Sequence, residues 1–124
     1  ELVAALRKVA IPFAVTALAQ EAGLASLKAE KELQDRIDVL ISERQRVYSG
    51  LLAAGLPVRP SGANFLWLDT GIHTGDLAGL FEDNALSVRA FPGEGIRVSV
   101  GTAEANDRVL AIARQAARLL LRQH

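Results

Sequence analysis

The first half of the chain has the spacing of apolar residues that is typical of helices. A short stretch from Leu2 to Val9 precedes Pro12, which has no amide proton and disfavours a helix in the residue before it. An alanine-rich stretch follows from about Val15 to Leu27. A long amphipathic segment then runs from about Glu30 to Ala54 and ends at Gly55, a residue type common just past a helix. The pattern predicts three helices.

The second half of the chain changes to the alternation of apolar and polar residues that strands show. The pattern predicts a strand over Phe65 to Leu68 and then a helix over Asp76 to Asp83. Two strands joined by a turn follow, over Leu86 to Ala90 and Ile96 to Val100, and a last helix begins at Thr102 and runs to about Arg122. Trp67 is predicted to be a core or half-buried packing group. This order predicts an α+β fold, in which a small antiparallel or mixed sheet has helices packed on one face.

The length and composition predict a globular chain of one domain's size. The chain has 124 residues, and 50% of them are hydrophobic, which excludes a disordered chain. Lys plus Arg number 14 and Asp plus Glu number 14, so the formal net charge is zero. Such a chain has no general attraction to nucleic acid or to acidic membranes, and we predict neither as a partner.

Cysteine is absent and the histidines are only His73 and His124, so the sequence predicts neither a disulfide nor a metal centre. The longest apolar run, Val9 to Ala19, is interrupted by Pro12 and Thr16 and is shorter than the roughly 20 residues of a spanning helix. The sequence also shows no secretory signal. We therefore predict no membrane span and a cytoplasmic location, with His73 solvated in a polar loop.

The turn between the last two predicted strands brings two arginines together. We assume that Ala90 pairs with Ile96. Arg89 then lies directly across from Arg97, on the face opposite the apolar residues of both strands. Like charges across a sheet repel by several tenths of a kcal/mol. A bound carboxylate or phosphate would reverse that sign, because a guanidinium grips it through two parallel hydrogen bonds.

Two interpretations of this arginine pair remain open. The pair is an anion clamp, or both guanidiniums are solvated or paired with acids such as Glu94 or Asp69. The sequence shows no glycine-rich phosphate loop after a strand, no nucleophile elbow and no metal motif. The lysines occupy polar positions of predicted helices and do not resemble buried Schiff-base groups; they are Lys8, Lys28 and Lys31.

Several short segments, taken in order and spacing, resemble one enzyme family. They are Ile11-Pro12-Phe13, Leu18-Ala19-Gln20, Glu43-Arg44, Ser61 to Leu68, Val88 to Phe91 and Gly95 to Gly101. The chain resembles the C-terminal part of a fold-type I, class I/II pyridoxal-phosphate aminotransferase, in particular histidinol-phosphate aminotransferase and its relatives that act on aromatic amino acids. The resemblance implies a small domain over residues 30–124 that includes a connecting helix over 30–54. It implies that the helical segment 1–29 belongs to the edge of a large domain outside this chain.

The resemblance also implies roles for individual residues. Arg97 falls on the arginine that binds the substrate α-carboxylate, and Arg89 on one that holds the substrate phosphate in the histidinol-phosphate branch. Asn64 and Phe65 match a signature near the substrate site, although a turn-capping Asn and a core Phe remain the alternative. Pro12 and Phe13 resemble the loop that approaches the active site of the partner subunit, so a homodimer is implied.

The resemblance places the cofactor outside this chain. The Schiff-base lysine and most groups that hold pyridoxal 5′-phosphate lie upstream in the family, so we expect this cofactor in the full-length parent enzyme and none bound to this chain. The chain starts without Met inside a helical pattern, and we expect it to be a piece of a longer protein. The predicted substrates are an amino acid and a 2-oxo acid. The alternative is a free-standing α+β module that binds or senses a small molecule. The coding sequence upstream of Glu1 would separate the two.

Overall fold

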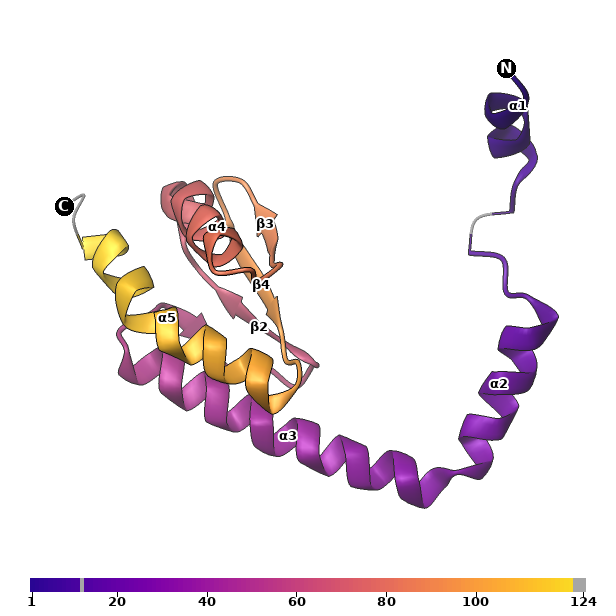
Figure 1. Ribbon diagram of the computed structural model, residues 1–124, viewed down its shortest axis with the longest axis horizontal. Coiled ribbons are helices and arrows are strands. Elements are labelled where there is room, and N and C mark those ends of the chain that lie inside the picture. Colours follow the sequence, from indigo (N-terminus) through magenta and orange to yellow (C-terminus); the bar gives the residue numbers. More distant parts are fainter. Residues whose placement is uncertain (12, 122–124) are drawn as a thin grey trace. The chain divides into compact units, whose positions relative to one another are not determined.

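A computed structural model of the chain describes residues 1–11 and 13–121, without the side chain of residue 121. Internal contacts divide the chain into two compact units, Glu1–Arg36 and Ile37–His124. Helix α3, Glu30–Ala53, belongs to both units (Figure 1). The prediction that residues 1–29 and 30–124 belong to different domains of a larger enzyme stays a prediction.

The first unit contains helices whose apolar side chains face solvent. Helix α1 spans Leu2–Val9 and helix α2 spans Ala17–Lys28, close to the predicted bounds. Thr16 caps α2, because its Oγ1 accepts a hydrogen bond from the amide of Ala19 at 3.2 Å. Neither helix has a buried residue. Large apolar side chains are instead more than half exposed, including Leu2, Val3, Leu6, Val9, Ile11, Val15, Leu18, Leu24 and Leu27.

The second unit has the predicted α+β fold. Its sheet has the strand order β1-β2-β4-β3, with every neighbouring pair antiparallel. The strands are β1 (Val58–Arg59), β2 (Phe65–Leu68), β3 (Arg89–Phe91) and β4 (Gly95–Ser99), and the helices after α3 are η1 (Gly71–His73), α4 (Thr74–Asp83) and α5 (Ala103–Leu121). Helix α5 was predicted to run to about Arg122, which lies outside the described residues.

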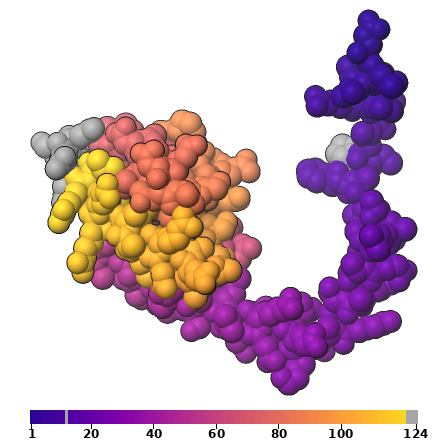
Figure 2. All heavy atoms as spheres, in the orientation of Figure 1, coloured from indigo at the N-terminus to yellow at the C-terminus, as the bar shows by residue number. Residues whose placement is uncertain are grey.

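One face of the sheet is covered by helices. The apolar residues Leu66, Leu68, Ile96 and Val98 of the central strands are buried against α4, α5 and the second half of α3 (Figure 1). Those helices contribute Val47, Leu51, Leu77, Phe81, Val109, Ile112 and Ala113 to the same core. Figure 2 shows the coral, orange and yellow atoms of α4, β4 and α5 packed against one another. Among the described residues of this unit, no helix lies on the other face of the sheet (Figure 1).

Three details differ from the sequence prediction. Strand β1 was not predicted. The predicted strand Leu86 to Ala90 begins only at Arg89. Ala85 has a left-handed backbone (φ 54°), and the amide of Leu86 donates to the carbonyl of Phe81 at 2.9 Å, so the chain closes the end of α4 before it joins the sheet. His73, predicted to be solvated, is buried at the start of α4.

No helix in the described part of the chain combines the length and the apolar character that crossing a bilayer requires.

Candidate functional site

The helix-free face of the sheet carries a row of large side chains across all four strands. Strand pairing sets Arg59 beside Trp67, Trp67 beside Arg97, and Arg97 beside Arg89. Side chains alternate along each strand, so these residues share the face opposite the core. Trp67 and Arg97 are half-buried and Arg89 is exposed. The row is the candidate site.

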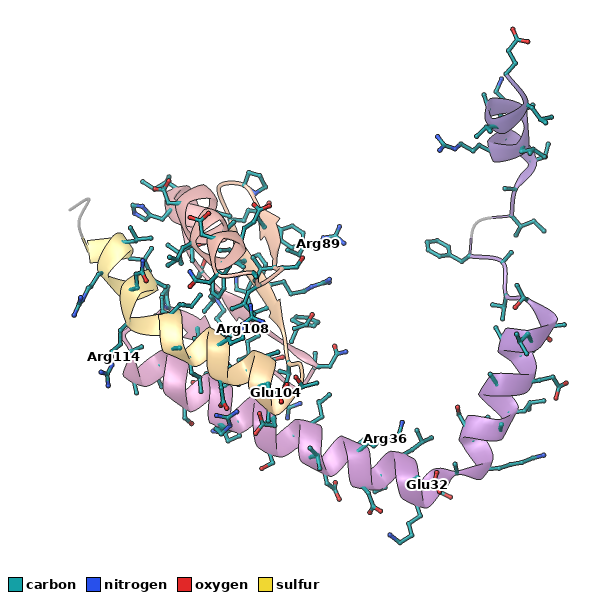
Figure 3. All side chains as sticks on the ribbon, viewed as in Figure 1. Glu32, Arg36, Arg89, Glu104, Arg108 and Arg114 are labelled. Carbon is teal, nitrogen blue, oxygen red and sulfur yellow. The ribbon has the colours of Figure 1, made fainter. Side chains whose placement is uncertain are left out.

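The pairing of Arg89 with Arg97 confirms the predicted register of the β3–β4 hairpin. One part of the alternative interpretation, pairing with Asp69 or Glu94, is not seen among the described residues, and the other part, solvation of both guanidiniums, stays open. Asp69 forms its ion pair with Arg59 instead. Among the described residues, neither Arg89 nor Arg97 has a carboxylate within ion-pair distance. Figure 3 shows Arg89 extending from the sheet into solvent, away from α4 and α5. Solvent or a ligand therefore balances the two charges.

Each of these two arginines lies over its own aromatic ring. The guanidinium carbon of Arg97 is 5.4 Å from the centre of the Phe65 ring, and that of Arg89 is 5.4 Å from the centre of the Phe91 ring. Both distances are within the range of a cation–π interaction. Phe91 was not predicted as a site residue. The signal was available, because Phe91 is two residues after Arg89 and thus on the same face of the strand.

The ring of Trp67 contacts Phe91 and covers Gly95. Its ring centre is 5.5 Å from that of Phe91, with the planes tilted by 57°. The ring lies directly over Gly95 of β4: a Cβ atom at Gly95 would be 2.5 Å from the Trp67 ring and 2.3 Å from the carbonyl oxygen of Leu68. Gly95 was predicted to belong to the turn and to a segment that resembles the family, without a packing role of its own. The structure shows that this position has room for glycine alone.

The loop before β2 is tied to α3. The guanidinium of Arg44 donates to the carbonyl of Ala63 at 3.1 Å, and the amide of Ala63 donates to Ser61 Oγ at 3.1 Å. Asn64 is exposed, and its main-chain carbonyl accepts from the amide of Val100 at 2.9 Å, which extends the pairing of β2 with β4. Phe65 follows at the start of β2. These contacts fix the position of the backbone from which the side chain of Phe65 extends.

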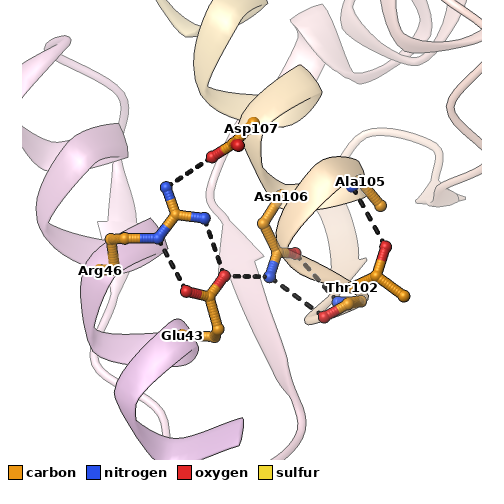
Figure 4. A network of polar contacts seen from close by, with 7 residues as sticks. Glu43, Arg46, Thr102, Ala105, Asn106 and Asp107 are labelled. Atoms are coloured by element: carbon orange, nitrogen blue, oxygen red, sulfur yellow. Dashed lines mark hydrogen bonds and ion pairs between the residues drawn. The ribbon is translucent and has the colours of Figure 1, made fainter. Parts of the chain in front are cut away.

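A polar network holds the turn between β4 and α5 (Figure 4). Arg46 on α3 donates to both carboxylate oxygens of Glu43, at 2.9 and 2.8 Å, and to Asp107 on α5 at 2.7 Å. Asn106 donates to Glu43 at 2.8 Å. The side-chain oxygen of Asn106 accepts from the amide of Gly101, at 3.0 Å. Because Gly101 follows β4 closely, the network fixes the end of the strand that carries Arg97.

The hydrogen bonds from Arg46 and Asn106 lower the pKa of Glu43 from 4.5 to about 2. A carboxyl whose pKa is lower in the folded state stabilises the fold above its unfolded value, and that contribution is lost as the pH falls. We therefore expect the free energy of unfolding to decrease from about pH 4.5 to about pH 2 because of this group. Chemical denaturation over this range measures it. Glu43→Gln should flatten the decrease.

Arg46→Gln is the matched variant for this pH dependence. Removing Arg46 takes away the largest cause of the low pKa, so the loss of stability should still begin near pH 4.5, where the unfolded carboxyl titrates, but it should be smaller and end at a higher pH than in the wild type. A Glu43→Gln variant with the same slope as the wild type between pH 4.5 and pH 2 would contradict the assignment to Glu43.

The predicted subunit-contact loop belongs to the first unit. Pro12 lies outside the described residues. Phe13 is fully exposed and has a left-handed backbone, with φ at 58°, which is uncommon for a bulky residue. Its predicted role toward a partner subunit stays a prediction.

The described residues do not fit a pyridoxal-phosphate site. The lysines of the chain, Lys8, Lys28 and Lys31, are all exposed and lie on helices of the first unit. Lys31 forms an exposed ion pair with Asp35 at 2.8 Å. A Schiff-base lysine is instead desolvated or placed beside another cation, which lowers its pKa. We derive no chemistry through that cofactor from these residues.

The family model described as "Aminotransferase class I and II" matches residues 1–113. The chain belongs to this family. A solved structure from Burkholderia pseudomallei, described only provisionally as an aminotransferase, has a TM-score of 0.73 and 26% identity to this chain. That match covers 93% of this chain and 37% of the other. The α+β fold of the chain is therefore consistent with its assignment to this family.

Two relatives of this aminotransferase chain are named aromatic amino acid aminotransferase. The protein from Thermobifida fusca is 48% identical over 114 residues, and the one from Streptomyces avermitilis is 50% identical over 109 residues. These matches cover 92% and 88% of this chain. They cover only 32% and 30% of the relatives, so the chain spans about a third of their length.

Proposed function

We propose that this chain is the C-terminal segment of an aminotransferase and contains its small domain. The whole enzyme would move an amino group between an amino acid and a 2-oxo acid. The observation that carries the proposal is the pairing of Arg89 with Arg97 on an uncovered sheet face, without an acidic partner in the described part of the chain. Membership of the class I and II aminotransferase family supports it.

Arg97 is the residue that we propose binds the α-carboxylate of the substrate. A guanidinium holds a carboxylate by two parallel hydrogen bonds, which fixes both its position and its orientation. Arg97 is half-buried beside Trp67, so part of its hydration is already lost before a ligand arrives. We also propose Phe65 and Asn64 at this site: Phe65 begins β2 and lies under the guanidinium of Arg97, and Asn64 directly precedes it. Every amino-acid donor and every 2-oxo acid presents the carboxylate that this arginine would take.

We favour an aromatic amino acid as the donor, because relatives of 48% and 50% identity have the corresponding name. Histidinol phosphate is the second candidate, and Arg89 is the observation in its favour. Its exposed guanidinium, unpaired with any described carboxylate, suits a phosphate.

The whole enzyme in this proposal is a homodimer that uses pyridoxal 5′-phosphate, the cofactor that this family generally employs as the carrier of the amino group. The residues that bind the cofactor would lie in the part of the enzyme outside this chain. Pro12 and Phe13 would then approach the active site of the partner subunit. A cytoplasmic location remains part of the proposal.

A donor panel tests the proposal on the whole enzyme. We expect transfer from phenylalanine, tyrosine and tryptophan to 2-oxoglutarate, and we expect Arg89→Lys to change kcat/KM by a factor that depends on the donor. The loss should be largest for histidinol phosphate, because lysine keeps the charge but loses the two-point grip on phosphate. Steady-state kinetics and thermal unfolding measure the two effects. A uniform loss for every donor, together with a lower melting temperature, would indicate a structural role for Arg89.

A further inference from the structure

The two arginines of the candidate site differ from ordinary surface arginines in how they are supported. In each, the guanidinium carbon is 5.4 Å from the centre of an aromatic ring, and the two rings belong to different residues. A long side chain on an open sheet face loses rotamer freedom when it binds an anion. A cation–π contact with a ring favours one position of the side chain before binding, so less of that freedom is lost when an anion binds.

The sheet geometry explains why each ring meets one arginine. Phe65 pairs with Ser99 across β2 and β4, so it is the diagonal neighbour of Arg97, within reach of a long side chain. Phe91 precedes the turn on β3 and shares a face with Arg89. Trp67 contacts Phe91, with 5.5 Å between the ring centres, and limits the space into which that ring can turn.

We propose that Phe65 and Phe91 are positioning residues, Phe65 for Arg97 and Phe91 for Arg89. The rings hold the guanidiniums in the orientation that accepts the anionic groups of the substrate. The inference rests on the proposed function, because it assigns Phe65 an action through Arg97 rather than contact with the substrate. The proposal predicts that affinity for the substrate carboxylate depends on the aromatic face of Phe65 more than on the apolar volume of its side chain.

Two substitutions of Phe65 in the whole enzyme separate these contributions. Phe65→Leu keeps an apolar side chain but removes the ring, and we expect the affinity for 3-phenylpropanoate, a carboxylate without an amino group, to fall by about threefold to thirtyfold. KM for amino-acid donors should rise by a similar factor with little change in kcat. Phe65→Tyr keeps the ring and should bind the probe within about twofold of the wild type. Equal losses in both variants would overturn the proposal.

A double-mutant cycle with Arg97→Gln tests whether Phe65 acts through Arg97. In that background the ring has no guanidinium to hold, so adding Phe65→Leu should weaken binding of 3-phenylpropanoate by less than about twofold. The same fold-loss in both backgrounds would overturn the proposal. If Arg97→Gln alone leaves the affinity for the probe unchanged, the proposed function itself fails. If it weakens binding while Phe65→Leu does not, only the positioning role fails.

Phe91→Leu is the matched comparison on the other arginine. It should reproduce the donor dependence of Arg89→Lys, with the largest rise in KM for a phosphate-bearing donor, and it should change the affinity for 3-phenylpropanoate less than Phe65→Leu does. Equal effects of the two Phe→Leu variants on all ligands would show that the rings serve only general packing, and would overturn the assignment of one ring to each arginine.

Discussion

Arg97→Lys is expected to lower kcat/KM of the whole enzyme by roughly one to two orders of magnitude. Lysine keeps the positive charge but loses the planar two-point grip on a carboxylate, and a charge-assisted hydrogen bond contributes about 1.5–3 kcal/mol. The loss should appear with every amino-acid donor, because each presents the same α-carboxylate. Steady-state kinetics against a panel of donors measures it.

The effect of Arg97→Lys on folding should be much smaller. Arg97 is half-buried on the uncovered face of the sheet and has no ion-pair partner among the described residues, so lysine leaves no carboxylate unpaired. The substitution also leaves the repulsion with Arg89 nearly unchanged, because lysine has the same positive charge as arginine. If kcat/KM stayed near the wild-type value for all donors, Arg97 would not be the carboxylate-binding residue.

Gly95→Ala is expected to destabilise the chain by about 2–4 kcal/mol, the largest effect on stability that we predict for a single added methyl group. The new Cβ would lie 2.3 Å from the carbonyl oxygen of Leu68 and 2.5 Å from the ring of Trp67. The ring can move, but the carbonyl belongs to the neighbouring strand and cannot move without disturbing the pairing of β2 with β4. The melting temperature should fall by at least about 8 °C.

Gly62→Ala is the control for this prediction. No atom lies within 4 Å of a Cβ at Gly62, so alanine there should change the stability by no more than about 1 kcal/mol, and in the stabilising direction. Trp67 is the single tryptophan of the chain, so its fluorescence reports displacement of the ring. A Gly95→Ala variant with the melting temperature and emission of the wild type would contradict the close packing of Trp67 on β4.

The sequence by itself determined most of the local elements and favoured one register, that of the β3–β4 hairpin. The bounds of α1 and of the long helix α3, which ends one residue before the predicted position, follow from periodicity and from Gly55. The β3–β4 pairing follows from a short turn between two alternating segments, which fixes the register of a hairpin. For that reason the opposition of Arg89 and Arg97 was predictable. The family resemblance was also readable from short segments in order.

Only the tertiary structure decided what surrounds the two arginines. Strand β1 is two residues long and has no period to detect, yet it brings Arg59 to Asp69 and so removes that acid from the arginine pair. The residues from Leu86 to Val88 alternate between apolar and polar as in a strand, but the amide of Leu86 donates to a carbonyl at the end of α4 instead of to a neighbouring strand. An alternating pattern records which side chains face a core. It does not record which backbone group supplies the hydrogen bonds.

The contacts between distant elements were equally outside the reach of the sequence. Glu43 meets Asn106 across 63 residues of chain, and Phe65 meets Arg97 across two strands that are not consecutive. Neither pair has a spacing that marks it, because long-range partners are set by how the helices and strands pack rather than by local periodicity. Gly95 illustrates the same point: a glycine beside a turn is common, and only the carbonyl of Leu68 and the ring of Trp67 next to it show why no larger residue fits.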